Sequence, residues 1–170
     1  MGAQYYIPTW GPKALAALLV VTHSQTNSPL FLHEVAGLKF YAGRKSWIYA
    51  LEDCEGKKSA LVQITNDIVL KAVNCLLQDK KDINDGVWLG LERSIFGSKS
   101  PWKWISGENI DTVKAQWNGH FPVDPSNHHC GKTIWEGKNQ TFKWEDADCD
   151  DMLPYICQGK LVFSLTPLLT

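Results

Sequence analysis

Hydrophobic and polar positions divide this chain into two parts with different patterns. In the first part, apolar residues alternate over 38–41, recur at helical spacing over 47–54 and 68–77, and form an unbroken run over 87–91. These patterns predict a strand, two amphipathic helices and a buried strand. Residues 97–153 form the second part, which is rich in Gly, Pro, Asn, Asp and Trp. Because long irregular segments of compact domains are often functional, we expect a binding surface in the second part.

The pattern also predicts how the helices begin. Ser46 stands in front of the first helix, and Thr65 or Asn66 stands in front of the second. Side-chain oxygens of these residue types accept the free N–H groups of a first helical turn. In the second part, only short pieces are strand-like, and these lie around 102–105, 133–135 and 141–144.

The first 24 residues have the pattern of a secretory signal peptide. Lys13 precedes an apolar run over 14–21, and Thr22 and Ser24 follow as small or hydroxyl residues. The run is too short to cross a bilayer, which takes about 20 apolar residues, but it suits a signal peptide. We therefore predict a signal peptide over 1–24, a linker over 25–37 and a secreted product without membrane insertion. A buried helix of the domain is the alternative.

Composition narrows the class of protein further. At 170 residues the chain can build one compact core but not two domains with linkers. The net charge of −1 gives no electrostatic footprint for nucleic acid. In an oxidising compartment, five cysteines predict two disulfides and one remaining thiol; they are Cys54, Cys75, Cys130, Cys149 and Cys157.

The most specific signal is an ordered series of motifs. It runs through Tyr41, Trp47, Ala50, Cys54, Leu61, Ile64, Trp88-Leu89-Gly90-Leu91, Trp102-Lys103-Trp104, Gly107, Trp117, Cys130, Trp144-Glu145-Asp146-Ala147-Asp148-Cys149 and Pro154-Tyr155-Ile156-Cys157. At this spacing the series resembles the C-type lectin-like domain family over residues 38–158, which leaves 159–170 as a C-terminal tail. The resemblance implies an α+β fold with two helices, two small antiparallel sheets and a long irregular loop region.

The resemblance also implies how the cysteines pair. Cys54 would pair with Cys157 and Cys130 with Cys149. Phe40 stands where the family's longer form has the second cysteine of an extra bridge, so the chain resembles the short form. Cys75 is left over beside an apolar helix face, which favours a buried thiol. An intermolecular bridge that makes a dimer is the alternative.

The calcium motif of sugar-binding family members is degenerate here. Phe121-Pro122-Val123 stands at the position of a Glu-Pro-Asn tripeptide, and His128 at the position of a liganding Glu. Calcium needs six to eight oxygen ligands, and imidazole is a poor substitute. Asp124, Glu145 and Asp146 are the remaining candidates, too few for the usual site. We therefore expect no cofactor, with calcium as the alternative.

These observations predict an extracellular recognition module, not an enzyme. The chain has no nucleophile elbow, zinc-protease motif or phosphate-binding glycine loop. We expect it to bind a protein or glycan ligand through its long-loop face, without the standard calcium site. The candidate ligand-binding residues are Trp117, Phe121, Asp124, Glu145 and Asp146, whereas Trp88, Trp102, Trp104 and Trp144 are assigned to the core. The alternative is a calcium-dependent carbohydrate-binding lectin with a remodelled cation site on Asp124, Glu145 and Asp146.

Two smaller features complete the interpretation. Asn139-Gln140-Thr141 is an acceptor sequence for N-glycosylation in a hydrophilic hairpin. His120, His128 and His129 lie near Cys130, but zinc would need a free thiolate or a third placed ligand. Since Cys130 is expected in a disulfide, we interpret them as loop histidines.

Overall fold

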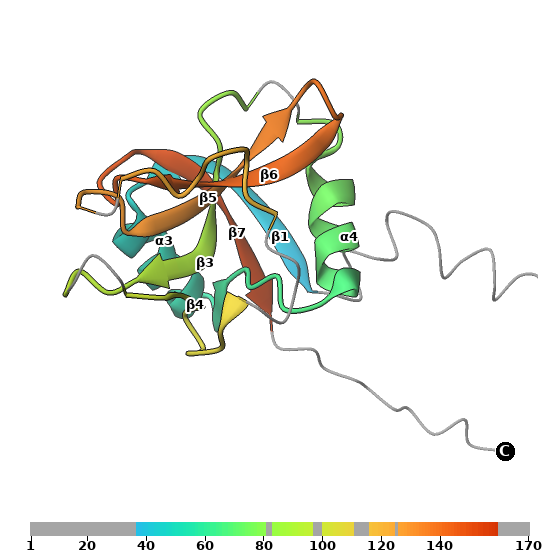
Figure 1. Cartoon of the computed structure of the whole chain (residues 1–170). Coiled ribbons are helices and arrows are strands. Elements are labelled where there is room, and N and C mark those ends of the chain that lie inside the picture. The colour runs from blue at the N-terminus through green and yellow to red at the C-terminus, as the bar shows by residue number, and fades with distance from the viewer. Residues whose placement is uncertain (1–36, 81–82, 97–99, 111–115, 125, 160–170) are drawn as a thin grey trace, which may run out of the picture.

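The computed structural model describes residues 37–80, 83–96, 100–110, 116–124 and 126–159 (Figure 1). The predicted signal peptide, the linker up to residue 36 and the tail from residue 160 lie outside the described residues. In chain order the elements are β1 (Leu38–Lys45), α3 (Trp47–Gly56), β2 (Ser59–Leu61), α4 (Asp67–Leu77), β3 (Val87–Arg93), β4 (Trp102–Trp104), β5 (Cys130–Glu136), β6 (Thr141–Ala147) and β7 (Leu153–Gly159).

Both predicted helices form, but only one has the expected side-chain cap. Asn66 caps α4, because its Oδ1 accepts the N–H groups of Ile68 and Val69, each at 3.0 Å. Ser46 occupies the N-cap position of α3 without such a bond, and its buried hydroxyl has no partner among the described residues. The expectation that Ser46 caps through its side chain is therefore wrong, and α3 is held by burial of its apolar face.

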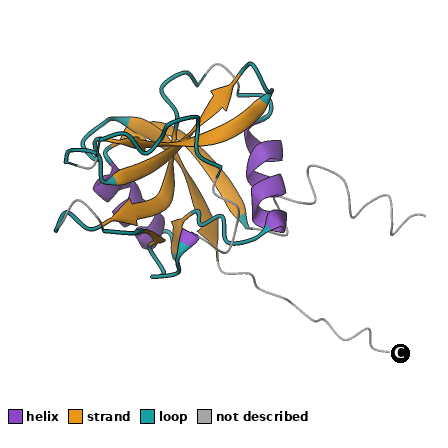
Figure 2. Ribbon diagram, viewed as in Figure 1, coloured by secondary structure: helices purple, strands orange, loops and turns teal. Residues whose placement is uncertain are grey.

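The strands form two antiparallel groups, as expected, but the groups are not separate sheets. β7 pairs with β1 and β2, while β3 pairs with β4 and β5, and β5 pairs with β6. A single parallel residue pair, Trp88 with Tyr155, joins β3 to β7. The described strands thus make one mixed sheet in the order β1-β7-β3-β5-β6, with β2 and β4 beside β7 and β3. Figure 2 shows these strands lying between the two helices.

Both predicted disulfides are confirmed. Cys54 of α3 is bonded to Cys157 of β7, across a sequence separation of 103 residues. Cys130 of β5 is bonded to Cys149, which follows β6, across 19 residues. The first bridge ties the first helix to the last strand, and the second ties the end of the β5–β6 hairpin to the loop that leaves it.

Large aromatic residues fill much of the core, as predicted. Trp88, Trp104 and Trp144 are at most 1% exposed and Trp102 is 8% exposed. Trp88 satisfies its indole N–H with the Lys45 carbonyl at 2.9 Å. Trp88 and the buried residues of α3 belong to one core cluster, and the other three tryptophans belong to a second, so tryptophan rings contribute to both clusters.

Cys75 carries a free thiol in α4 and is partly buried. It lines a small cavity of about 240 Å³ with Trp135 and Phe142, from the β5–β6 hairpin. The dimer alternative for this residue stays a prediction. Neither α3 nor α4 is long and apolar enough to cross a bilayer, and the described residues contain no other helix that is.

Candidate functional site

We define the long-loop surface as the described residues of 116–129 together with Glu145 and Asp146 of β6. Its first segment runs along β6 (Figure 1). The N–H of Trp144 donates to the Gln116 carbonyl at 2.7 Å, and the N–H of Asn118 donates to the Trp144 carbonyl at 2.8 Å. These bonds cover part of the outer edge of β6, which pairs with no other strand on that side among those described.

Trp117 is anchored by this arrangement. Its ring lies 5.2 Å from that of Trp102 and 6.1 Å from that of Trp144, both in edge-on geometry. Edge-on aromatic pairs of this spacing are favourable. The residue is half-buried against the core, so only part of the ring is available to a ligand.

Asp146 is a buried residue that holds the backbone of the long-loop surface in place. Its side chain is fully buried. Oδ1 accepts the N–H of Val123 and Oδ2 accepts the N–H of Asp124, both at 2.9 Å. The His128 ring lies beside it, with Nδ1 at 3.3 Å from Oδ2. Because charge-assisted bonds to backbone N–H groups are strong, this carboxylate fixes the turn that contains Val123 and Asp124.

Arg93, at the end of β3, donates hydrogen bonds to carbonyl groups of the same loop. Its Nη2 donates to the Asp124 carbonyl at 3.0 Å, and its Nε donates to the His128 carbonyl at 3.1 Å. The guanidinium lies 5.4 Å from the centre of the Trp102 ring. At 7% exposure, this charge would be costly to bury without such bonds. One buried anion and one buried cation therefore fix the loop between them.

The Asp124 side chain is used within its own turn. Oδ1 accepts the N–H groups of Ser126 and Asn127, at 3.0 and 3.1 Å, and Oδ2 accepts the Asn127 amide at 2.8 Å. These bonds, that of the Asn127 side chain foremost, hold the pKa of Asp124 below its ordinary value. Its turn role matches the ordinary use of Asp in such loops.

Glu145 points to the neighbouring strand and loop. Its Oε1 accepts the Asn118 amide at 2.9 Å, and its Oε2 lies 3.8 Å from the ammonium of Lys132, its cross-strand neighbour on β5. The three calcium candidates therefore each face protein donors with both oxygens. Within the described part of the chain, no group of three or more His, Cys, Asp or Glu side chains is arranged to hold a metal ion.

The outward side of this surface is mixed in character. Val123 is 52% exposed, and its neighbour Phe121 is half-exposed in front of a cis Phe121–Pro122 bond. His120 and Asn127 are exposed as well. A patch with one or two apolar contacts inside a polar rim is typical of recognition surfaces.

Sequence reasoning missed the residues that hold the loop. Arg93 ends an apolar strand, and its position gives no sign that the guanidinium is buried. Asp146 was selected as a ligand candidate, but the structure places it under the loop. The alternation of buried positions along β6, with Phe142, Trp144 and Asp146 inward, is the signal that could have shown this, since alternate residues of a strand share a face.

Comparisons with known proteins confirm the family resemblance. The Lectin C-type domain family model matches residues 43–159, more than half of the chain. The chain is similar to mouse regenerating islet-derived protein 3-alpha, at 27% identity over 120 residues that cover 68% of this chain and 66% of that protein. It is also similar to human C-type mannose receptor 2, at 28% identity over 115 residues, 68% of this chain and 7% of the receptor.

A solved structure agrees with the fold. Human lithostathine superposes with a TM-score of 0.59 at 21% identity, covering 72% of this chain and 89% of that one. This likeness concerns the fold alone. The chain spans just under two thirds of the length of the mouse relative and a small part of the mannose receptor.

Proposed function

We propose, from the premise that this chain belongs to the C-type lectin domain family, that it is an extracellular recognition module. It binds a protein or glycan ligand through the long-loop surface and does not transform that ligand chemically. The name of the similar mannose receptor supports a glycan. Binding through this surface does not need a calcium ion.

One observation carries this proposal. Asp146 and Arg93 together make four hydrogen bonds to the backbone of Val123, Asp124 and His128, and these bonds fix the turn. A rigid, preformed loop loses little conformational entropy when a ligand binds. The exposed side chains beside the fixed turn, Phe121 and Val123, are therefore the proposed contact residues, with Trp117 and Glu145 at the border.

Binding to intact cells in calcium and in EDTA tests the proposal. We expect the full chain to bind equally in both, and we expect Phe121→Ala and Val123→Asp each to weaken binding by about tenfold, because both are near the centre of the surface. Ile48→Ala is the matched control, since Ile48 is also an exposed apolar residue, at 48%, but lies on α3. Glycosidase treatment of the cells separates a glycan ligand from a protein ligand.

Binding that requires calcium and is lost in Asp146→Ala but unchanged in Phe121→Ala would instead support a lectin with a cation site on Asp124, Glu145 and Asp146. This result would contradict the proposed mode of recognition. The ligand class would then be a saccharide whose hydroxyls share the calcium ion.

We also propose that Asn139 is glycosylated. It is exposed in the turn between β5 and β6, with its amide 2.7 Å from the carboxylate of Glu136. A glycan there would project from the hairpin without covering a buried residue. A mass decrease after treatment with an N-glycosidase, absent in Asn139→Gln, tests this for chain made in a secreting cell.

A further inference from the structure

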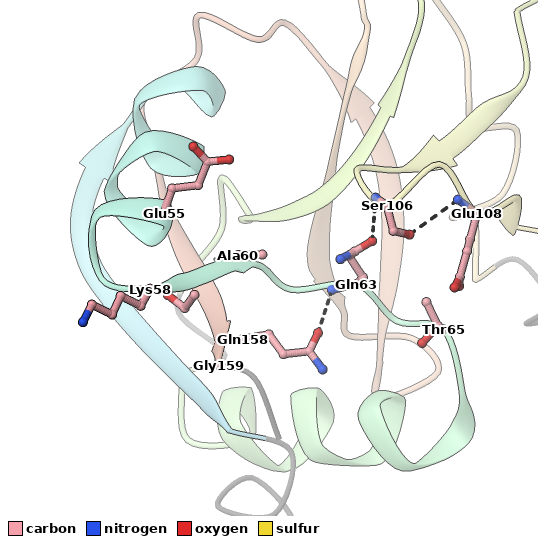
Figure 3. Close-up of a pocket in the computed structure, with 10 residues that line it drawn as sticks. Glu55, Lys58, Ala60, Gln63, Thr65, Ser106, Glu108, Gln158 and Gly159 are labelled. Carbon is pink, nitrogen blue, oxygen red and sulfur yellow. Dashed lines mark hydrogen bonds between the residues drawn. The ribbon is translucent and has the colours of Figure 1, made fainter. Parts of the chain in front are cut away.

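A polar pocket of about 720 Å³ lies apart from the long-loop surface and shares no residue with it (Figure 3). It is formed where the end of α3, strand β2, the segment after β2 and the turn after β4 meet the end of β7. The volume is in the range of small-molecule sites, about 300–1,000 Å³. Its polar lining side chains include Glu55, Lys58, Gln63, Thr65, Glu108 and Gln158.

Two glutamine side chains in the pocket are held in one orientation by backbone donors. The N–H of Gln63 donates to Oε1 of Gln158 at 3.2 Å, and the N–H of Ser106 donates to Oε1 of Gln63 at 2.9 Å. Since each amide oxygen accepts a backbone N–H, the other end of each amide is an NH₂ donor. Figure 3 shows the two side chains close together, with both bonds drawn as dashes. Neither NH₂ group has a protein acceptor among the described residues.

Other lining elements supply hydrogen-bond acceptors. Glu108 lies in the turn after β4, Thr65 precedes α4, and Glu55 lies near the end of α3. Within the described residues, neither glutamate carboxylate has a protein partner. The ammonium of Lys58 adds a charged donor at the rim. The pocket therefore presents oriented donors and unoccupied acceptors from four parts of the chain.

We propose that this pocket is a second binding site, specific for a neutral saccharide. A sugar hydroxyl both donates and accepts, so neighbouring hydroxyls can satisfy the glutamine NH₂ groups and the glutamates at the same time. With two carboxylates and one ammonium the lining is net negative, which disfavours an anionic ligand. An apolar ligand would find no aromatic or large aliphatic side chain in the lining. This inference does not depend on the proposed function of the long-loop surface.

The test follows the side-chain amide NMR signals of Gln63 and Gln158 in the full chain, in EDTA. The probes are three neutral trisaccharides, namely maltotriose, cellotriose and tri-N-acetylchitotriose, with sialyllactose as an anionic comparison. We expect at least one neutral probe to shift both glutamine signals, and sialyllactose to shift them less. Glu108→Ala and Glu55→Ala should each weaken that binding about tenfold, because each removes a charged acceptor.

Two variants serve as controls. Glu52→Ala removes an exposed glutamate from the same helix as Glu55 but outside the pocket, so binding should not change. Phe121→Ala alters the long-loop surface and should also leave it unchanged. The proposal is overturned if no neutral probe shifts the glutamine signals, if both pocket variants bind as the parent does, or if Phe121→Ala abolishes the shift.

Discussion

Asp146 is the residue on which the geometry of the long-loop surface depends most directly. The two oxygens of this fully buried side chain accept the N–H groups of Val123 and Asp124. In Asp146→Ala these two donors lose their acceptor, and the charge of Arg93 stays buried nearby. Unsatisfied buried groups of this kind cost about 1–3 kcal/mol each. We expect the variant to lose about 3 kcal/mol of unfolding free energy, measured by urea denaturation with disulfides intact.

Asp151→Ala is the control for this prediction. Asp151 is also an acidic residue near Cys149, but it is exposed, and no side-chain contact involves its carboxylate among the described residues. Its replacement should change the unfolding free energy by less than about 0.5 kcal/mol. Equal losses in the two variants would show that the Asp146 bonds do not stabilise the fold.

Asp53 gives a prediction about acid stability. Its carboxylate accepts hydrogen bonds from Lys45, at 2.7 Å, and from Lys57 and Tyr155. These bonds, that of Lys45 foremost, lower the pKa of Asp53 well below its ordinary value of 3.8. The unfolded chain therefore binds this proton more readily than the folded one. The stabilising contribution is complete above the ordinary pKa and is lost as the pH falls below it toward the folded value.

We therefore expect Asp53→Asn to be less stable than the parent at neutral pH, with the difference shrinking as the solution is acidified below the ordinary pKa. Urea denaturation of both proteins at a series of pH values measures this. A stability difference that stays constant over the acid range would contradict the assignment. Burial, and after it the hydrogen bond with Asp53, raises the pKa of Tyr155.

At the residue scale, sequence reasoning identified chemical types better than it identified roles. It selected Asp124, Glu145 and Asp146 because carboxylates are calcium ligands. The structure shows that each accepts hydrogen bonds or lies near a cation of the protein itself. Whether a carboxylate faces solvent or a neighbouring backbone depends on contacts between segments far apart in the chain, which spacing does not record.

At the scale of the elements, β3 lies very close to the backbone of β2 and of the segment after it, and Gly90 is where this close approach occurs. A Cβ on Gly90 would lie 2.8 Å from the Leu61 carbonyl oxygen and 3.2 Å from that of Val62. These are backbone atoms of β2 and the segment after it, so they cannot rotate away. We expect Gly90→Ala to cost about 2 kcal/mol, in the range of overpacked cores, measured by thermal and urea unfolding.

Gly43→Ala in β1 is the matched control. A Cβ there would meet no heavy atom within 4 Å, so stability should stay the same or rise slightly through the lower entropy of the unfolded chain. A Gly90→Ala protein as stable as Gly43→Ala would mean that β2 and β3 can separate without cost.

The two disulfides should differ in what their removal costs. In the chain-entropy treatment, closing 103 residues stabilises by about 4.7 kcal/mol and closing 19 residues by about 3.2 kcal/mol. We expect Cys54→Ala/Cys157→Ala to lose more stability than Cys130→Ala/Cys149→Ala. Urea denaturation of the two double variants makes the comparison, and the opposite order would contradict it.

The helices and β3 could be predicted from periodicity alone, because their apolar residues recur at regular spacing. β5, β6 and β7 could not be bounded in this way. β7 lies between β1 and β3 in the sheet, yet its sequence was recognised only through the family resemblance. Its pairing partners are more than 90 residues away in the case of β1 and β2, and local patterns carry no information at that distance.

For the molecule as a whole, calcium should have no effect on stability. A ligand that binds only the folded state stabilises it by about 2.7 kcal/mol at a concentration 100 times its dissociation constant. Since the candidate oxygens already face protein donors, we expect the same melting temperature in millimolar calcium as in EDTA. A rise in melting temperature that is abolished in Asp146→Ala would favour the calcium-dependent alternative. Differential scanning calorimetry of the parent and of Asp146→Ala, in calcium and in EDTA, measures these melting temperatures.

The pairing of β1 with β7 has a consequence for architecture. Gly37 and Gly159 meet at one end of this pair, where the N–H of Gly159 donates to the Gly37 carbonyl at 2.9 Å. The strand order puts this pair at the other edge of the sheet from β6. Because the two ends of the domain lie side by side, such a unit can be inserted into a longer polypeptide with little change in the distance between the segments on either side of it.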